Sequence, residues 1–181
     1  MSGDAAGAIW GGFVADAASL GFHWLYDPKR IAELAGDAPA FRAPDPADFD
    51  GAMGVFVHPG KRAGDLSQYG VQMRVMLDSL RAVGGWDKGD FQTRFAQTFG
   101  AGGSWSGYID KATKGTLAGI AEEREPSGAA DDQLPAIAKL PPLMWALRWN
   151  DGWAAAAMEA VEVTSNHDTV RAWAPAAIAA L

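Results

Sequence analysis

One stretch, residues 64–73 with the sequence GDLSQYGVQM, constrains the fold most because it opens the most regular amphipathic helix of the chain. Apolar side chains follow at helical spacing, at Met73, Met76, Leu77 and Leu80. This period of about 3.6 residues predicts a helix over about residues 66–83 with one face packed in a core. Two consecutive glycines after Val83 end that helix.

Three polar side chains, Asp65, Tyr69 and Gln72, occupy another corner of the same helix start. Their spacings of four and three residues place them on one stripe. One face is therefore built to pack, and one corner is built to present polar groups. That corner is the first candidate for a binding or catalytic site.

The composition favours helices over sheets. Alanine and glycine are abundant among the 181 residues, hydrophobic residues make up 49%, and continuous runs of β-branched residues are rare. We expect one all-α domain over residues 1–181, because a chain of this length can bury a core of ordinary size.

Charge and cysteine content exclude several classes of function. The net charge of −7, from 15 basic and 22 acidic residues, argues against a nucleic-acid groove. Without cysteine there is no disulfide, thiolate nucleophile, iron–sulfur cluster or cysteine-based zinc site. No segment is long and apolar enough to span a membrane, and the N-terminal run lacks a basic leader. We expect a cytoplasmic protein with no membrane or nucleic-acid partner.

The first helix is expected from about Asp4 to Leu20, and it carries one acid on its apolar stripe. Asp16 falls on the same face as Ile9 and Phe13. An ionised carboxylate among apolar neighbours needs a cation, backbone donors or a metal as its partner. Asp16 is therefore either a site residue or a structural acid that caps a neighbouring helix.

His23 lies among aromatic residues directly after this helix, in the sequence GFHWLYDPKR. Such a ring is either packed and hydrogen-bonded in the core or, because it lies at a helix end, part of a site. Asp27 then caps a second helix that starts at Pro28. Residues 36–63 contain four prolines, which predicts a long excursion with at most one short helix near residues 46–49.

The rest of the chain predicts further helices joined by polar turns. The first of these helices is capped by Asp87 or Asp90 and runs through Phe99, and the second covers about residues 108–123. Two short helices follow, broken at Pro141 and Pro142. A helix over about residues 151–163 and a last helix close the sequence. The apolar pattern of the last helix predicts a fragment of a longer protein, a split gene product, or a chain completed by an oligomer partner.

Three more polar side chains lie beside these helices. Asp131 and Asp132 precede a short helix, and His167 lies in the polar turn TSNHD before the last helix. Paired acids at a helix start either cap the helix or accept hydrogen bonds from a sugar or a cation. All three residues are therefore candidates for ligand contacts.

Several motifs together resemble the ADP-ribosylglycohydrolase family. The first helix of that family, in which small residues lead to an Asp, resembles GAIWGGFVADAASL. A branch that includes the J1-crystallins resembles FHWLYD, HPGKRAGDLSQYG and ADDQLPAIAKLPPL. A Thr-His turn of the family is similar to EVTSNHD. The resemblance follows the family's order over most of the chain.

The resemblance implies a compact bundle of helices around a central cleft, of which this chain is either a whole divergent member or the N-terminal part. Active members hold Mg²⁺ with two acidic runs, one at the start of a helix and one near the C-terminus. The first run would fall here on residues 68–71, QYGV, which contain no carboxylate, and the chain ends before the second. Hard cations such as Mg²⁺ prefer carboxylate oxygen.

Two functions are expected from this resemblance. An active hydrolase would cleave the glycosidic bond of ADP-ribose or a related nucleotide-sugar adduct, with Mg²⁺ as the family's cofactor. Asp65 or Asp16 would then serve as acid or base, and the substrate contacts would be His23, Tyr69, Gln72, Asp131, Asp132 and His167. The alternative is a catalytically inactive ligand-binding or structural protein, as in the crystallin-like branch. The expected ligand is a small nucleotide-sugar. We also expect the chain to pair either with a second copy of itself or with a missing C-terminal half.

Overall fold

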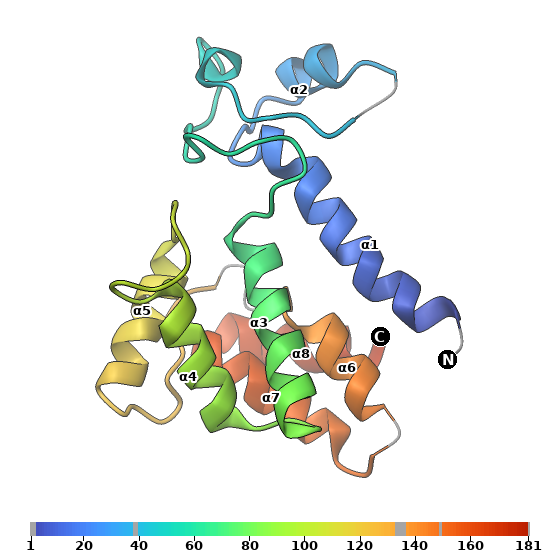
Figure 1. The fold of residues 1–181 in the computed structure, drawn as a ribbon, viewed down its shortest axis with the longest axis vertical. Helices are drawn as coiled ribbons and strands as arrows, with labels where there is room; N and C mark the ends of the chain where they lie inside the picture. The colour runs from blue at the N-terminus through green and yellow to red at the C-terminus, as the bar shows by residue number, and fades with distance from the viewer. Residues whose placement is uncertain (1–2, 38–39, 133–136, 149, 181) are drawn as a thin grey trace. The chain divides into compact units, whose positions relative to one another are not determined.

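A computed structural model describes residues 3–37, 40–132, 137–148 and 150–180. Within these residues the chain forms eight α-helices and two short 3₁₀-helices, and no β-strand (Figure 1). The predicted all-α fold is thus confirmed. In the same ranges no helix combines the length and the apolar character that crossing a bilayer requires.

The chain divides into two compact units, residues 1–70 and residues 71–181. Helix α3 (Gln68–Val83) begins in the first unit and continues in the second. It starts two residues later than the sequence pattern predicts and ends where predicted. The expectation of a single domain over residues 1–181 stays a prediction.

The first unit begins with a long helix, α1 (Gly3–Ser19), and a 3₁₀-turn, η1 (Leu20–Phe22). Helix α2 (Pro28–Ala35) follows, and η2 (Pro46–Phe49) is the short helix of the long excursion. These bounds agree with the predicted helices. Asp27 caps α2 as predicted, because its carboxylate accepts hydrogen bonds from the backbone N–H groups of Lys29 and Arg30 at 3.0 and 3.1 Å.

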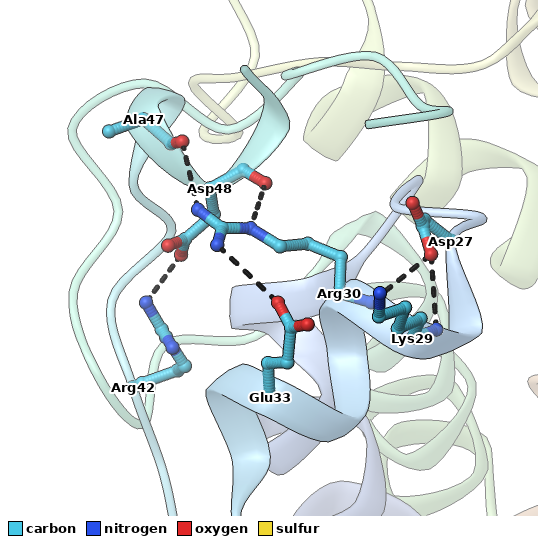
Figure 2. Close-up of polar contacts among 7 residues, drawn as sticks. All are labelled: Asp27, Lys29, Arg30, Glu33, Arg42, Ala47 and Asp48. Atoms are coloured by element: carbon cyan, nitrogen blue, oxygen red, sulfur yellow. Dashed lines mark hydrogen bonds and ion pairs between the residues drawn. The ribbon is translucent and has the colours of Figure 1, made fainter. Parts of the chain in front are cut away.

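Two arginine side chains hold the excursion over residues 36–63, one within the excursion and one from α2 (Figure 2). Asp48 is 5% exposed and pairs with the guanidinium of Arg42. Arg30 on α2 donates from Nε to the backbone oxygen of Asp48 at 3.2 Å and from Nη2 to that of Ala47 at 3.4 Å. Charge-assisted hydrogen bonds therefore hold this segment where regular secondary structure does not.

Five more helices in the described residues make up the second unit: α4 (Lys88–Phe99), α5 (Lys111–Ala121), α6 (Leu140–Leu147), α7 (Trp153–Thr164) and α8 (Asp168–Ala180). Helix α7 lies at their centre, since it contacts α4, α5, α6 and α8. The small side chains of Ala157 and Ala160 are fully buried. Because they take up little room, the neighbouring helices can approach α7 closely.

An aromatic stripe of α4 belongs to the core. Phe91, Phe95 and Phe99 are buried, and the centres of consecutive rings lie 5.9 and 4.9 Å apart. Aromatic pairs at such distances add to the free energy that the rings gain by burial. The four-residue spacing thus indicates a packed face.

Two predicted helix ends need correction or refinement. Asp87, and not Asp90, caps α4, because the Asp87 carboxylate accepts from the backbone N–H of Asp90 at 2.8 Å. The predicted break at Pro141 and Pro142 is wrong. Both prolines lie in the first turn of α6, where the helix needs no backbone N–H from them. The other predicted short helix falls partly on residues 133–136, which lie outside the described residues.

Candidate functional site

The start of α3 is organised by Ser67. Its hydroxyl accepts a hydrogen bond from the backbone N–H of Tyr69 at 3.0 Å. Serine directly before a helix commonly satisfies a first-turn N–H in this way. Ser67 is 2% exposed, so the cap is buried.

Asp16 on α1 meets Ser67 with both carboxylate oxygens. Oδ2 accepts from the backbone N–H of Ser67 at 2.8 Å, and Oδ1 accepts from its hydroxyl at 2.5 Å. The carboxylate thereby finds the partner that its apolar stripe requires, and it supports the cap of a neighbouring helix. The contact also places a carboxylate at the polar start of α3.

Two histidines and a tyrosine of the first unit complete this cluster. Nδ1 of His23 and Nε2 of His58 are 2.6 Å apart and share a hydrogen bond. The two imidazole rings stack with centres 4.8 Å apart, and the ring of Tyr69 meets that of His23 edge-on at 5.3 Å. The structure thus brings together the predicted Asp16, His23 and Tyr69 through two residues that were not predicted, Ser67 and His58. We refer to these five residues as the α3 cluster.

The environment of His58 keeps its imidazole neutral. Burial, with smaller effects of His23 and Lys61, lowers the pKa of His58 from 6.5 to about 4, against an opposing effect of Asp16. Near pH 7 one of its ring nitrogens is therefore a donor and the other an acceptor. The α3 cluster thus offers one carboxylate together with a buried, neutral imidazole.

Asp65, the other predicted acid, bonds to Arg62. Its Oδ2 accepts from the backbone N–H of Arg62 at 2.8 Å, and its Oδ1 lies 3.8 Å from Nη2 of the same residue. These contacts close the turn that precedes α3. The Asp65 carboxylate is thereby engaged within its own turn.

Gln72 belongs to the second unit and lines a small cavity. Its Nε2 donates to Oγ1 of Thr113 at 3.2 Å. Asp110 caps α5 beside it by accepting from the backbone N–H of Thr113 at 2.7 Å. The cavity has a volume of about 10 Å³, also lined by Thr116 and Thr164, which is room for one water at most. Gln72 therefore ties α3 to α5.

The remaining predicted residues, Asp131, Asp132 and His167, lie in the second unit, and two of them make hydrogen bonds with its turns. The backbone oxygen of Asp131 accepts from the hydroxyl of Ser165 at 2.8 Å, which holds this segment against the end of α7. Nδ1 of His167 accepts from the backbone N–H of Thr169 at 3.2 Å in the first turn of α8. Asp131 is buried and Asp132 is exposed. Contact of these residues with a ligand stays a prediction.

A buried lysine in the second unit escaped the sequence reasoning. Lys139 is fully buried, and its Nζ donates to Oγ1 of Thr164. Burial lowers the pKa of this amine from 10.5 to about 7. The sequence signal was its place in the apolar run AIAKLPPL, because lysine is seldom fully buried.

The side chains at the start of α3 do not fit Mg²⁺, the cofactor that the family resemblance implies. Mg²⁺ favours carboxylate and water oxygens in an octahedral set. Residues 68–71 contain no carboxylate, and both oxygens of Asp16 already accept hydrogen bonds. The described part of the chain contains no group of three or more His, Cys, Asp or Glu side chains able to hold a metal ion. We therefore assign no step of the chemistry to a metal.

Comparison with known proteins identifies one family. The family described as ADP-ribosylglycohydrolase matches residues 3–181, nearly the whole chain. The match is to the family as a whole, so the resemblance to the crystallin-like branch stays a prediction. Neither the curated proteins nor the solved structures gave a significant match.

Proposed function

Because this chain belongs to the ADP-ribosylglycohydrolase family, we propose that it binds an ADP-ribose-type nucleotide sugar and hydrolyses its glycosidic bond. The observation that supports this proposal most is the α3 cluster, in which Asp16, His23 and Tyr69 meet through Ser67 and His58. A carboxylate, an imidazole and a phenol within one unit supply the donors and acceptors that a sugar and a water need.

The proposed chemistry centres on Asp16. Hydrolysis of an N- or O-glycosidic bond develops positive charge on the sugar ring, which a nearby carboxylate stabilises. A water oxygen bonds to the anomeric carbon while the glycosidic bond breaks and its electron pair goes to the leaving group. Asp16 accepts the proton of the attacking water, and the leaving group takes up a proton from solvent. The products are free ADP-ribose and the released side chain or small adduct.

The other predicted residues have supporting places in this proposal. His23 and Tyr69 contact the sugar or its phosphates from the α3 cluster. Asp65 remains the alternative acid, and Asp16 is preferred because it belongs to the α3 cluster.

Ligand binding without catalysis is a second function that the contacts of Asp16 favour. Both oxygens of Asp16 accept hydrogen bonds from Ser67. The carboxylate thus supports the cap of α3, a structural role that needs no catalysis. In that case the chain keeps the polar cluster for its ligand and does not accelerate hydrolysis.

Binding and hydrolysis measured on the same protein separate these two functions. We expect ADP-ribose to raise Tm and an ADP-ribosylated peptide to release free ADP-ribose, each tested with and without Mg²⁺. A Tm shift without release supports the binding function. The absence of both contradicts the proposal.

Substitution of Asp16 tests the assigned role. Asp16→Asn keeps the shape of the side chain and should abolish release while retaining part of the binding. Asp151→Asn is the matched control, because it removes an exposed acid in the turn before α7 and should leave both readouts unchanged. Far-UV circular dichroism establishes that both variants are folded at the assay temperature.

A further inference from the structure

The two histidines of the α3 cluster differ in what they can reach. His58 is 2% exposed and His23 is half-buried, so His23 is the one that can touch a ligand. Their contact joins Nδ1 of His23 to Nε2 of His58. The nitrogen of each ring that takes no part in this contact is therefore Nε2 in His23 and Nδ1 in His58.

The proton in this contact belongs to one ring or the other. If His23 donates, His58 must carry its own proton on Nδ1, where the N–H is buried and finds no hydrogen-bond partner among the described residues. If His58 donates from Nε2, its Nδ1 holds only a lone pair. A buried N–H without a partner is rarer in proteins than an unsatisfied acceptor. The second arrangement is therefore favoured.

A doubly protonated His58 is not a third arrangement near neutral pH. Burial, His23 and Lys61 all disfavour the charged ring and lower its pKa to about 4. Asp16 opposes these effects without outweighing them.

We propose that His58 is a positioning residue that donates from Nε2 to Nδ1 of His23 and so holds His23 in the tautomer protonated on Nε2. A partner that fixes the tautomer of a functional histidine is a recurring arrangement in protein sites. His23 then presents an N–H donor, and the edge-on ring of Tyr69 restrains its plane. This donor suits an acceptor oxygen of the ligand. That His23 contacts the ligand rests on the proposed function, whereas its tautomer does not.

The tautomers can be read directly because the chain contains only three histidines. In long-range ¹H–¹⁵N spectra of the unliganded protein near pH 7, we expect protonated Nε2 and unprotonated Nδ1 on both His23 and His58. His167 provides an internal reference. A protonated Nδ1 on His23 or on His58 overturns the proposal.

Two substitutions distinguish the effect of the His58 hydrogen bond from the effect of the space that its ring fills. His58→Gln keeps a donor near the position of Nε2, whereas His58→Phe keeps a buried ring and removes the donor. We expect His23 to become a mixture of tautomers in His58→Phe and to retain one tautomer in His58→Gln. A His23 spectrum that is the same in His58→Phe as in the original protein overturns the proposal.

Ligand affinity gives a readout that a merely structural role would not reproduce. We expect His58→Phe to weaken ADP-ribose binding roughly three- to tenfold, which corresponds to one neutral hydrogen bond, and His58→Gln to restore most of the affinity. Equal weakening by both variants overturns the positioning role. The affinities of His58→Phe for ADP and for ADP-ribose locate the acceptor. If both affinities fall by the same factor, the acceptor is an oxygen of the ADP part. If only the affinity for ADP-ribose falls, the acceptor belongs to the terminal ribose. If the original protein binds no ADP-ribose, the proposed function fails while the spectra still decide the tautomer.

Discussion

Gly70 lies so close to Asp16 that a β-carbon at position 70 would come within 2.3 Å of Oδ2 of Asp16 and 2.8 Å of its Cγ. Glycine inside a helix is unfavourable by itself, by roughly 0.5–1 kcal/mol relative to alanine. Helix α3 nevertheless needs glycine in its first turn, because a larger residue would push the carboxylate away from Ser67.

Gly70→Ala should therefore destabilise the protein in spite of the better helix propensity of alanine. We expect the free energy of unfolding to fall by about 1–3 kcal/mol, because the hydrogen bonds between Asp16 and Ser67 are strained or lost. Gly89→Ala in the first turn of α4 is the matched control, since the nearest atom to its β-carbon lies at an ordinary distance of 3.4 Å. That control should be neutral or slightly stabilising. Urea denaturation measures both, and equal effects of the two variants would contradict this explanation.

Asp16 and Ser67 should be energetically coupled. Ser67→Ala removes both a helix cap and a donor to Asp16, and we expect it to cost about 1–2 kcal/mol. A double-mutant cycle with Asp16→Asn should give a coupling energy of roughly 0.5–3 kcal/mol. Additive effects of the two substitutions, measured by urea denaturation, would show that the contact contributes nothing of its own.

The sequence predicted most helices because their signals are local. Asp27 and Pro28 stand next to each other at the start of α2, and the stripe of Phe91, Phe95 and Phe99 lies within one helix. Caps, prolines and a helical period act over a few residues, so one short segment contains the whole signal. The ambiguity at Pro141 and Pro142 arose because a proline ends one helix and starts another equally well.

The α3 cluster could be predicted only in part because its contacts join distant residues. Asp16 and Ser67 are 51 residues apart, and His23 and His58 are 35 apart. Periodicity showed that Asp16 needed a partner, and it could not show which residue that partner was. Ser67 carried the local signal of a helix cap, whereas His58 had only its residue type.

Protonation of His58 should make stability depend on pH in the acid range. The unfolded chain protonates this ring below about pH 6.5 and the folded chain only below about pH 4, so between these values the unfolded state holds more protons. The free energy of unfolding should therefore rise from pH 4 to pH 6.5, by roughly 3 kcal/mol from this group. His23, Lys61 and Asp16 act on the His58 charge and set the size of the effect. Urea denaturation at pH 4.5 and 6.5 measures this rise in the free energy of unfolding. We expect a smaller rise in His58→Phe and the full rise in the control His167→Gln. Equal rises in the two variants would contradict the assignment.

The ion pair within the long excursion should also be measurable. Arg42→Met leaves the buried carboxylate of Asp48 without its guanidinium partner. We expect a loss of roughly 1–3 kcal/mol, less than for a fully buried pair because the Arg42 side chain is 28% exposed. Asp48→Asn added to Arg42→Met removes the unpaired charge and should recover part of the loss. Thermal denaturation tests both variants, and a double variant no more stable than the single one would show that the charge was not the cause.

Burial of Lys139 should make stability rise with pH in the alkaline range. The folded chain releases the Lys139 proton above about pH 7 and the unfolded chain only above about pH 10.5, so between these values the unfolded state again holds more protons. Lys139→Met removes the buried charge, and Thr164 keeps a hydrogen bond to the backbone oxygen of Val161 at 3.4 Å. The variant should be more stable than the original protein by roughly 3–5 kcal/mol at pH 6, and this gain should shrink steadily toward pH 10.

The Lys139 prediction depends on a difference between variants, so the titration of other groups cancels. Urea denaturation of both proteins at pH 6, 8 and 10 provides the three free energies of unfolding that the comparison needs. Lys111→Met is the matched control, because Lys111 is exposed in the first turn of α5 and its removal should change stability equally at all three values. A gain of Lys139→Met that stays constant with pH would mean that the variant acts through packing, and that the folded protein holds Lys139 in its charged form throughout.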